Sequence, residues 1–177
     1  MKKILYFAAL LLSISFTSCE KEDVGSTATE NTAGQWYVRV DGVDADGNVI
    51  DGFENFFSND PVQIITYNTS ANVGSEMIVD DLSEIWDFKV KVACDQAART
   101  FQTTVADGET NNLRGDDITV KIWGGKILPG AGRQNNGSVA DSIVFYVSFS
   151  DDPYPAQYGH SAYKVSGVRY SGLAEND

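Results

Sequence analysis

The sequence has few of the residues that build metal centres and disulfide frameworks. Its 177 residues include one histidine, two cysteines and four prolines. A structural zinc site takes four cysteine or histidine ligands, and a small disulfide-rich domain needs several cysteine pairs. The three residues present leave almost no material for either. We therefore expect no metal, no other cofactor, and a domain stabilised by its hydrophobic core alone.

Basic side chains are also scarce. The chain has 13 lysines and arginines against 25 aspartates and glutamates, which gives a net charge of -12. Contacts with nucleic-acid phosphates need clustered lysine and arginine. This balance therefore excludes a nucleic-acid partner.

The sequence offers little for hydrolysis. It contains no G-x-S-x-G nucleophile elbow, and His160 is its one histidine base. Ser161 follows directly, and neighbouring residues of a strand point to opposite faces. We interpret His160 as a loop or strand-edge residue and expect no catalytic residue.

Three pairs of adjacent aspartates could supply the two carboxyl groups of a glycosidase. They are Asp80–Asp81, Asp116–Asp117 and Asp151–Asp152. Each pair stands where a predicted strand ends, and side chains of sequence neighbours diverge there. We interpret all three pairs as solvated turn residues.

A further acidic stretch approaches the pattern of a calcium-binding loop. Its oxygen-bearing residues are Asp44, Asp46, Asn48 and Asp51. The distal glutamate and the full oxygen spacing of an EF-hand are absent. An Asp-Gly hairpin explains the stretch, so we predict a turn here.

The N-terminus is typical of an exported protein. Two lysines precede an apolar run, Ile4 to Phe16, that is too short to cross a bilayer core of about 30 Å comfortably. The run ends in Phe16-Thr17-Ser18-Cys19, which resembles the lipobox of bacterial lipoproteins. We predict a signal peptide over residues 1–18 and acylation of Cys19, which would anchor the protein to a membrane. The alternative is an ordinary signal peptide with an incidental cysteine.

Residues 19–33 are predicted to form a lipidated, flexible tether. The acidic cluster from Glu20 to Asp23 resembles the export signal that sends Bacteroidetes lipoproteins to the outer face of the outer membrane. We therefore expect an outer-membrane lipoprotein at the cell surface, with a solvated linker as the alternative explanation of the cluster. Acylation of Cys19 would leave Cys94 as a small buried thiol without a disulfide partner.

Alternation of apolar and polar residues dominates the rest of the chain. Clear examples are residues 36–41, 85–94 and 142–149, and turn-forming residues separate such runs. No segment has convincing helical periodicity. We predict an all-β domain over residues 34–172, with eight or nine antiparallel strands in a sandwich or up-and-down barrel, and a C-terminal tail over residues 173–177.

A tryptophan and a late arginine favour the barrel. Gly34-Gln35-Trp36 opens the first predicted strand, and Arg169 lies in the last one. This combination resembles the calycins, the lipocalins and their relatives. The resemblance implies that Trp36 closes the floor of an eight-stranded barrel and that Arg169 packs across its face in a cation–π contact.

The chain also resembles the Bacteroidetes family called lipid-binding putative hydrolases. The resembling stretches are AGQWYV, ITYNTSAN, IWDFKVKV, SVADSIVFYVSFSDDP and YKVSGVRYSG, which together cover most of residues 33–172. The family is described as lipocalin-like lipoproteins. The resemblance implies binding of a lipid, whereas the hydrolase part of the name corresponds to no defined catalytic motif.

Aromatic residues are the candidate ligand site, since the chain has 9 phenylalanines, 8 tyrosines and 3 tryptophans. We predict that Tyr158 and Tyr163 lie at the entrance of the barrel. The predicted function is binding of a small apolar or lipid ligand. The alternatives are a lipid or ester hydrolase, and a filled barrel that contacts glycan or partner proteins through its loops; the oligomeric state is not predicted. The candidate wall residues are Trp86, Phe88, Phe101, Phe145 and Phe149.

Overall fold

The computed structural model describes residues 26–104, 109–115 and 117–173. The predicted signal peptide, Cys19, the acidic cluster after it and Asp116 lie outside the described residues. The helix among the described residues has five residues, and no described helix is long and apolar enough to cross a membrane. The elements are β1 Gly34–Val43, β2 Val62–Asn68, β3 Glu76–Asp80, β4 Lys89–Asp95, β5 Thr100–Gln102, β6 Glu109–Asn111, β7 Thr119–Arg133, β8 Val139–Phe149, α2 Tyr154–Tyr158 and β9 Ala162–Arg169.

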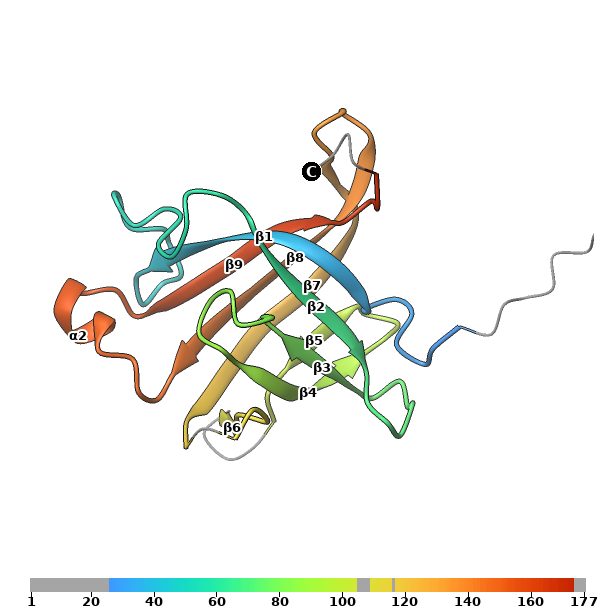
Figure 1. Ribbon diagram of the computed structural model, residues 1–177, viewed down its shortest axis with the longest axis horizontal. Coiled ribbons are helices and arrows are strands. Elements are labelled where there is room, and N and C mark those ends of the chain that lie inside the picture. The colour runs from blue at the N-terminus through green and yellow to red at the C-terminus, as the bar shows by residue number, and fades with distance from the viewer. Residues whose placement is uncertain (1–25, 105–108, 116, 174–177) are drawn as a thin grey trace, which may run out of the picture.

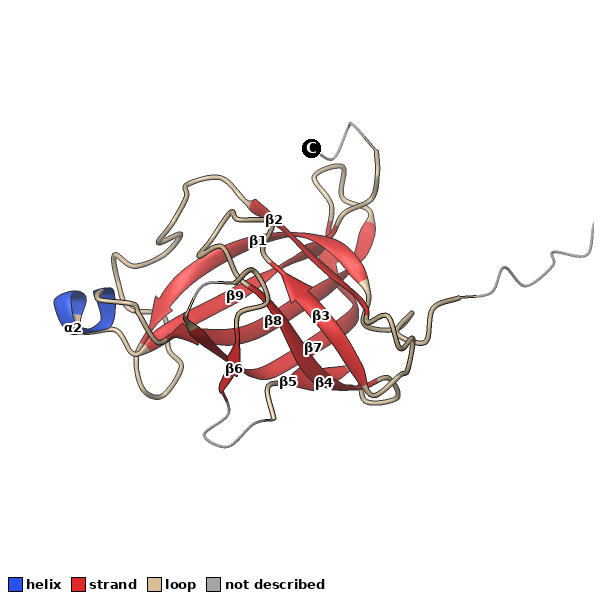
Figure 2. Cartoon of the chain, turned by 60° about the horizontal axis from the view of Figure 1, so that its bottom comes forward, coloured by secondary structure: helices blue, strands red, loops and turns tan. Residues whose placement is uncertain are grey.

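Eight of the strands form a closed antiparallel barrel. The strand order is β5-β4-β3-β2-β1-β9-β8-β7, and pairing between β5 and β7 closes the ring. The ninth strand, β6, pairs with the first residues of β7 outside the ring. Figure 2 shows the strands curving around a common interior. The prediction of an all-β, up-and-down barrel is confirmed.

The alternating sequence places one face of each strand inside the barrel. In β1, Trp36, Val38 and Val40 are buried and the residues between them are not. β8 repeats this pattern, because every second residue from Ile143 to Phe149 is buried. Side chains in a strand point alternately to opposite faces, so these residues meet in one core. That core contains nineteen buried residues contributed by the strands and the turn before β4.

One predicted strand begins later than the alternation indicates. Residues 81–88 form a loop, and β4 starts at Lys89. Leu82, Ser83 and Asp87 have positive φ angles of 54°, 65° and 55°, which residues other than glycine do not adopt in a regular strand. Trp86 therefore lies on a loop at the end of the barrel rather than on a strand inside it.

The loops group at two ends of the barrel, which we name the mouth and the floor. The mouth carries residues 44–61, 81–88 and 150–161, together with the described residues that precede β7. The floor carries residues 69–75, 96–99 and 134–138 and the chain segment before β1. In Figure 1, α2 lies at the mouth, and the first described residues lie at the opposite end.

The floor is closed around Trp36, which is fully buried. Its indole Nε1 donates a hydrogen bond to Thr66 Oγ1 at 3.0 Å. The guanidinium of Arg169 lies 4.5 Å from the centre of the indole ring and donates to the carbonyl oxygen of Ala33 at 2.8 Å. Trp36 and Arg169, the two residues that the calycin resemblance pairs, are in contact in the structure.

The segment before β1 also packs against the floor. Thr29 and Thr32 are fully buried, and the Thr66 hydroxyl donates to the Thr32 carbonyl at 2.7 Å. Gln96 donates to the Thr32 hydroxyl from the β4–β5 loop. The prediction of a flexible tether therefore does not hold for Thr29 to Ala33, because small polar residues form a packed turn as readily as a linker.

Candidate functional site

Nine rings close the mouth of the barrel. Each lies within 4.8–6.1 Å of at least one other, measured between ring centroids. They come from four separate parts of the chain, so the fold rather than local sequence assembles them. We name this set the mouth cluster, and its members are Phe53, Phe56, Phe57, Trp86, Phe149, Tyr154, Tyr158, His160 and Tyr163.

The β1–β2 loop supplies the three phenylalanines. Its backbone is hydrogen-bonded to the end of β1. The Phe53 carbonyl accepts from the Gly42 amide, and the Phe56 amide donates to the Val40 carbonyl. Gly42 leaves room for this approach, since a β-carbon there would lie 3.1 Å from Phe53 Cβ. Phe57 points onto Tyr163, with the ring centroids 4.9 Å apart. These contacts hold the phenylalanines over the barrel opening.

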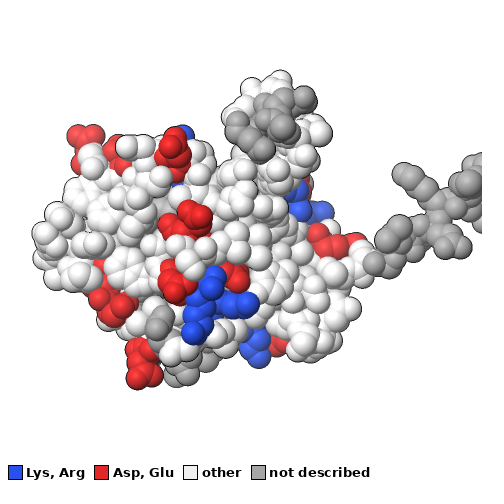
Figure 3. Space-filling view, viewed as in Figure 1, with Lys and Arg blue, Asp and Glu red and all other residues white. Residues whose placement is uncertain are grey.

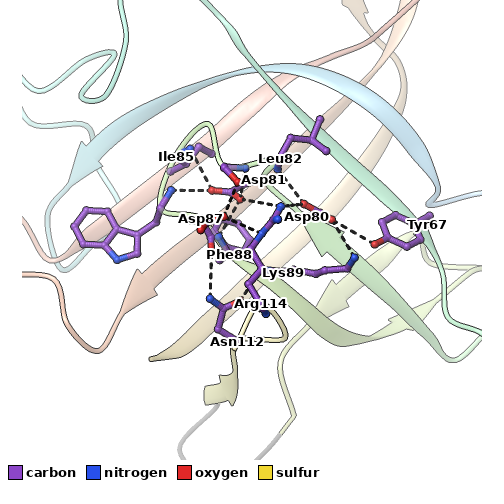
Figure 4. A network of polar contacts seen from close by, with 12 residues as sticks. Tyr67, Asp80, Asp81, Leu82, Ile85, Asp87, Phe88, Lys89, Asn112 and Arg114 are labelled. Atoms are coloured by element: carbon purple, nitrogen blue, oxygen red, sulfur yellow. Dashed lines mark hydrogen bonds and ion pairs between the residues drawn. The ribbon is translucent and has the colours of Figure 1, made fainter. Parts of the chain in front are cut away.

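The β3–β4 loop supplies Trp86, and a buried carboxylate shapes this loop. Asp81 is fully buried and accepts hydrogen bonds from the backbone amides of Ser83, Ile85, Trp86 and Phe88 at 2.7–3.1 Å (Figure 4). Burial raises the pKa of Asp81, and the four amide donors oppose that rise. The loop is therefore fixed from within, and its strained residues are held in place by Asp81.

Asp80 extends this network to the neighbouring strands. Its carboxylate accepts from Arg114 at 2.6 Å and from the Tyr67 hydroxyl at 3.3 Å, and Lys89 lies 3.5 Å away (Figure 4). Basic side chains on this face lie beside acidic ones (Figure 3). The interpretation of Asp80–Asp81 as solvated turn residues is wrong. The pair does end a strand, but both residues are buried, because backbone amides receive the carboxylate of Asp81 and Arg114 receives that of Asp80.

Two contacts fix the Trp86 side chain, one at a face of its ring and one at its ring nitrogen. Its indole stacks on Phe149 with the centroids 5.0 Å apart and an interplanar angle of 8°. Its Nε1 donates to the carboxylate of Asp151 at 2.9 Å. The next residue, Asp152, accepts a hydrogen bond from the Tyr163 hydroxyl at 2.7 Å. Both residues of the pair Asp151–Asp152 therefore bind side chains of the mouth cluster.

The β8–β9 segment covers the cluster from outside. None of the residues of α2 is buried, and the helix reaches the other rings through Tyr154 and Tyr158. Tyr158 is 47% exposed. Gly159 ends the helix in the left-handed region at φ 82°. α2 therefore covers the cluster without being buried itself, and it contacts the barrel mainly through the rings of Tyr154 and Tyr158.

His160 lies under this cover. It is 3% exposed, and its ring centroid lies 4.8 Å from Tyr163 and 5.2 Å from Phe56. Among the described residues, neither of its ring nitrogens has a hydrogen-bond partner. Burial lowers the pKa of His160, and the nearby charge of Asp152 opposes this shift. Ser161 is exposed, and no hydrogen bond joins the two residues that the sequence places side by side.

The predicted wall residues fall into two layers. Trp86, Phe88 and Phe149 meet near the mouth, where the Phe88 and Phe149 centroids are 5.5 Å apart. Phe101 and Phe145 form a separate pair deeper in the barrel, with centroids 5.6 Å apart. Of the predicted entrance residues, Tyr163 is fully buried inside the mouth cluster, and Tyr158 lies on its outer side. Whether any of these residues binds a ligand remains a prediction.

Sequence reasoning missed five members of the cluster. They lie on loops or on the short helix α2, where no alternation marks a side chain as buried. A run of three phenylalanines in five residues, within an otherwise polar stretch, was the available signal. The missed residues are Phe53, Phe56, Phe57, Tyr154 and His160.

Other parts of the described chain offer less for a site. No group of three or more metal-ligating side chains occurs among the residues that the structure describes. Asp44 accepts from the amides of Asp46 and Asn48, as expected of a turn, and these bonds lower its pKa. Two grooves of about 470 and 460 Å³ lie along β4, β5 and β7 and along β1 and β9. Neither groove is lined by a member of the mouth cluster.

Comparison with known protein families gives a match over most of the chain. The model of a family described as "lipid-binding putative hydrolase" matches residues 21–174. The matched range contains all nine strands and every member of the mouth cluster. No curated protein matches the chain.

Proposed function

The chain belongs to the family of lipid-binding putative hydrolases, and we propose that it binds the apolar part of a small lipid at the mouth of its barrel. The observation that carries this proposal is the closure of the mouth by rings from four parts of the chain. Barrel mouths are common ligand sites, and an eight-stranded barrel has an interior just wide enough for side chains or one small ligand.

The ring contacts suit exchange with a hydrocarbon chain. A contact between two aromatic rings contributes about 0.5–1.5 kcal/mol beyond the burial of area. Apolar burial has no preferred direction, so a lipid chain can replace one ring against another. Each methylene group that a ligand buries contributes about 0.8 kcal/mol. A chain inserted among the rings would therefore offset the displacement of Tyr154 and Tyr158.

The cover over the mouth is the segment that would move. No residue of α2 is buried, and Gly159 supplies a flexible backbone position directly after the helix. The phenylalanine loop on the other side is bonded by its backbone to β1. We therefore assign entry of the ligand to the α2 side of the cluster.

Tryptophan fluorescence tests the proposal with a matched pair of variants. Trp86 stacks on Phe149 at the mouth, and Trp123 stacks on Tyr146 on the outer face, with centroids 5.8 Å apart. Addition of 1-dodecanol should change the emission of the unmodified protein and of Trp123→Phe, and the change should be lost in Trp86→Phe. An unchanged emission and an unchanged melting temperature with dodecanol would instead favour a filled barrel that acts through its loops.

We also infer that the protein is exported and anchored through an acylated Cys19 at the cell surface of the outer membrane. The support is the signal-like segment, the lipobox-like residues before Cys19 and the acidic residues after it. Several acyl chains on one residue give stable anchoring. The chain enters the barrel at the floor (Figure 1). An anchor on that side would leave the mouth directed away from the membrane.

Replacement of the cysteine tests the anchor. Cys19→Ala should move the protein from the membrane fraction to the soluble fraction and abolish labelling by a fatty-acid analogue. Cys94→Ala is the matched control and should leave both unchanged, because Cys94 lies in β4 and is half-buried. Retention of Cys19→Ala in membranes would contradict the inference.

A further inference from the structure

The side chain of His160 is deeply buried, and neither of its ring nitrogens has a hydrogen-bond partner in the part of the chain that the structure describes. Buried polar groups are paired in the great majority of cases, since an unpaired one costs free energy. Thr29 and Gln96 each leave one buried side-chain oxygen unpaired, whereas His160 leaves both of its ring nitrogens unpaired among the described residues. The imidazole is thus the polar group of the mouth cluster that still needs a partner.

The position of His160 makes it reachable by a ligand in the mouth. Its ring lies 5.8 Å from Phe53 and 5.2 Å from Phe56, between ring centroids. The same two phenylalanines support Tyr158, at 6.0 and 6.1 Å. Gly159 lies between Tyr158 and His160. If α2 moved at this glycine, Tyr158 would leave Phe53 and Phe56, the two rings that contact the imidazole.

The hydrogen-bonding chemistry of His160 defines the partner that fits. Its low pKa keeps the imidazole neutral at pH 7, with one N–H donor and one acceptor nitrogen. A hydroxyl group also has one donor and spare acceptor capacity, so it can pair with either nitrogen. A carboxylate has acceptors only and would meet the carboxylate of Asp152, which already binds the Tyr163 hydroxyl. An ammonium group can pair only with the acceptor nitrogen, and burial of its charge among the rings costs far more than burial of a hydroxyl.

We propose that His160 is the polar contact of the mouth and selects lipids with an uncharged hydroxyl head group over ionised fatty acids. This inference rests on the proposed function, because it assigns the head group of the ligand whose chain lies among the rings. Fatty alcohols, monoacylglycerols and sterols have this chemistry.

Three ligands with one chain length separate the head group from the chain. 1-Dodecanol donates and accepts, dodecyl methyl ether only accepts, and dodecanoate is charged at pH 7.5. Their dissociation constants would be measured by calorimetry on the mature exported protein. We expect dodecanol to bind up to about tenfold more tightly than the ether, because the hydroxyl can pair with either nitrogen and the ether oxygen only with the N–H. We expect dodecanoate to bind more weakly than dodecanol.

Two substitutions assign the preference to His160. His160→Phe keeps a ring of similar size and should weaken dodecanol binding about tenfold. It should weaken ether binding less, because the ether oxygen can pair only with the imidazole N–H. Thr29→Val is the matched control, since it removes another unpaired buried polar atom at the floor, and it should change no affinity. His160→Gln retains a donor and an acceptor and should keep part of the preference for dodecanol.

The outcomes distinguish this inference from the proposed function. If all three ligands bind equally, if dodecanoate binds most tightly, or if His160→Phe keeps the preference, the role of His160 is wrong and the lipid site stands. If none of the three binds to the unmodified protein, both proposals are wrong. Thermal unfolding of each variant shows whether it is folded, and His160→Gln provides the test if His160→Phe is not.

Discussion

At the floor of the barrel Trp36 is enclosed by directional bonds, whereas at the mouth the rings are held together mainly by contacts with one another. Trp36 donates to Thr66, carries Arg169 on its face and is fully buried. The mouth cluster contains an imidazole with no hydrogen bond to the described residues and an outer tyrosine that is 47% exposed. Directional bonds fix one geometry, while ring packing tolerates replacement of one apolar partner by another. The difference identifies the floor as the permanent closure and the mouth as the exchangeable one.

The comparison predicts that the floor contributes most to stability. Trp36→Ala should lower the free energy of unfolding by about 3–5 kcal/mol, because it removes a fully buried indole and leaves Thr66 with one partner fewer. Urea unfolding followed by circular dichroism measures this loss. Trp123→Ala on the outer face should cost less, since Trp123 is only half-buried. Equal losses in the two variants would remove the distinction between the floor and an ordinary surface position.

The next largest effect is expected at the β3–β4 loop of the mouth, which Asp81 fixes. Asp81→Asn replaces a charged acceptor of four backbone amides and should cost about 2–3 kcal/mol. It should also shift the emission of Trp86, whose backbone amide is one of the four donors. The control Asp44→Asn changes a half-buried turn carboxylate in the β1–β2 loop and should cost less. If Trp86 emission is unaffected, Asp81 does not set the loop conformation.

A smaller effect is expected from the arginine at the floor. Arg169→Met keeps an apolar chain over Trp36 but removes the cation, and a cation–π contact contributes about 0.5–2 kcal/mol. Unfolding in urea should show a loss in this range. Arg133→Met, on the hairpin beyond the barrel, removes bonds to the nearby carbonyls of Gly130 and Gly132 and should have little effect. A loss as large for Arg133 as for Arg169 would contradict the assignment.

The smallest effect has the opposite sign. His160→Phe removes an unpaired polar group from an apolar cluster and should raise the free energy of unfolding by about 1 kcal/mol, or the melting temperature by about 2–4 °C. A gain in stability combined with a loss of dodecanol binding would mark His160 as a residue kept for recognition. A loss of stability would show that the imidazole is well accommodated.

The same variant tests a dependence on pH. Burial lowers the pKa of His160 below its ordinary value of 6.5, so the folded protein binds this proton less tightly than the unfolded chain does. The contribution to stability is therefore present above pH 6.5 and is lost as the pH falls below it. The melting temperature should fall more between pH 7.5 and 5.5 in the unmodified protein than in His160→Phe. Parallel curves for the two proteins would contradict the shift.

The barrel could be predicted from the sequence because its strands alternate. In β8 every second residue is apolar, and the buried face follows directly from that period. The pairing of Trp36 with Arg169 followed from a family resemblance rather than from the pattern. The start of β4 was mispredicted because Trp86 and Phe88 continue the alternation into a loop that hydrogen bonds to Asp81 hold in shape.

The mouth could be predicted only in part, since loop residues carry no period. Phe88 and Phe149 were identified because they adjoin or belong to strands. The loop phenylalanines and His160 were not, because their burial depends on contacts between segments about 100 residues apart. The burial of Asp81 was missed for a related reason. An aspartate beside a turn looks the same in sequence whether its carboxylate meets water or backbone amides.

The closure of the ring between β5 and β7 has a consequence for aggregation. Two residue pairs join these strands, Thr100 with Lys126 and Phe101 with Gly125, and hydrogen bonds from Ile127 to Arg99 and from Thr103 to Ile122 flank them. Gly125 is required there, since a β-carbon would lie 2.5 Å from the Phe101 ring. Rupture of this short seam would turn a cylinder without edges into an open sheet with two free strands, ready to pair with another molecule. The packing of Phe101 against Gly125 therefore helps to keep the strand edges paired and protects the folded protein from fibre formation.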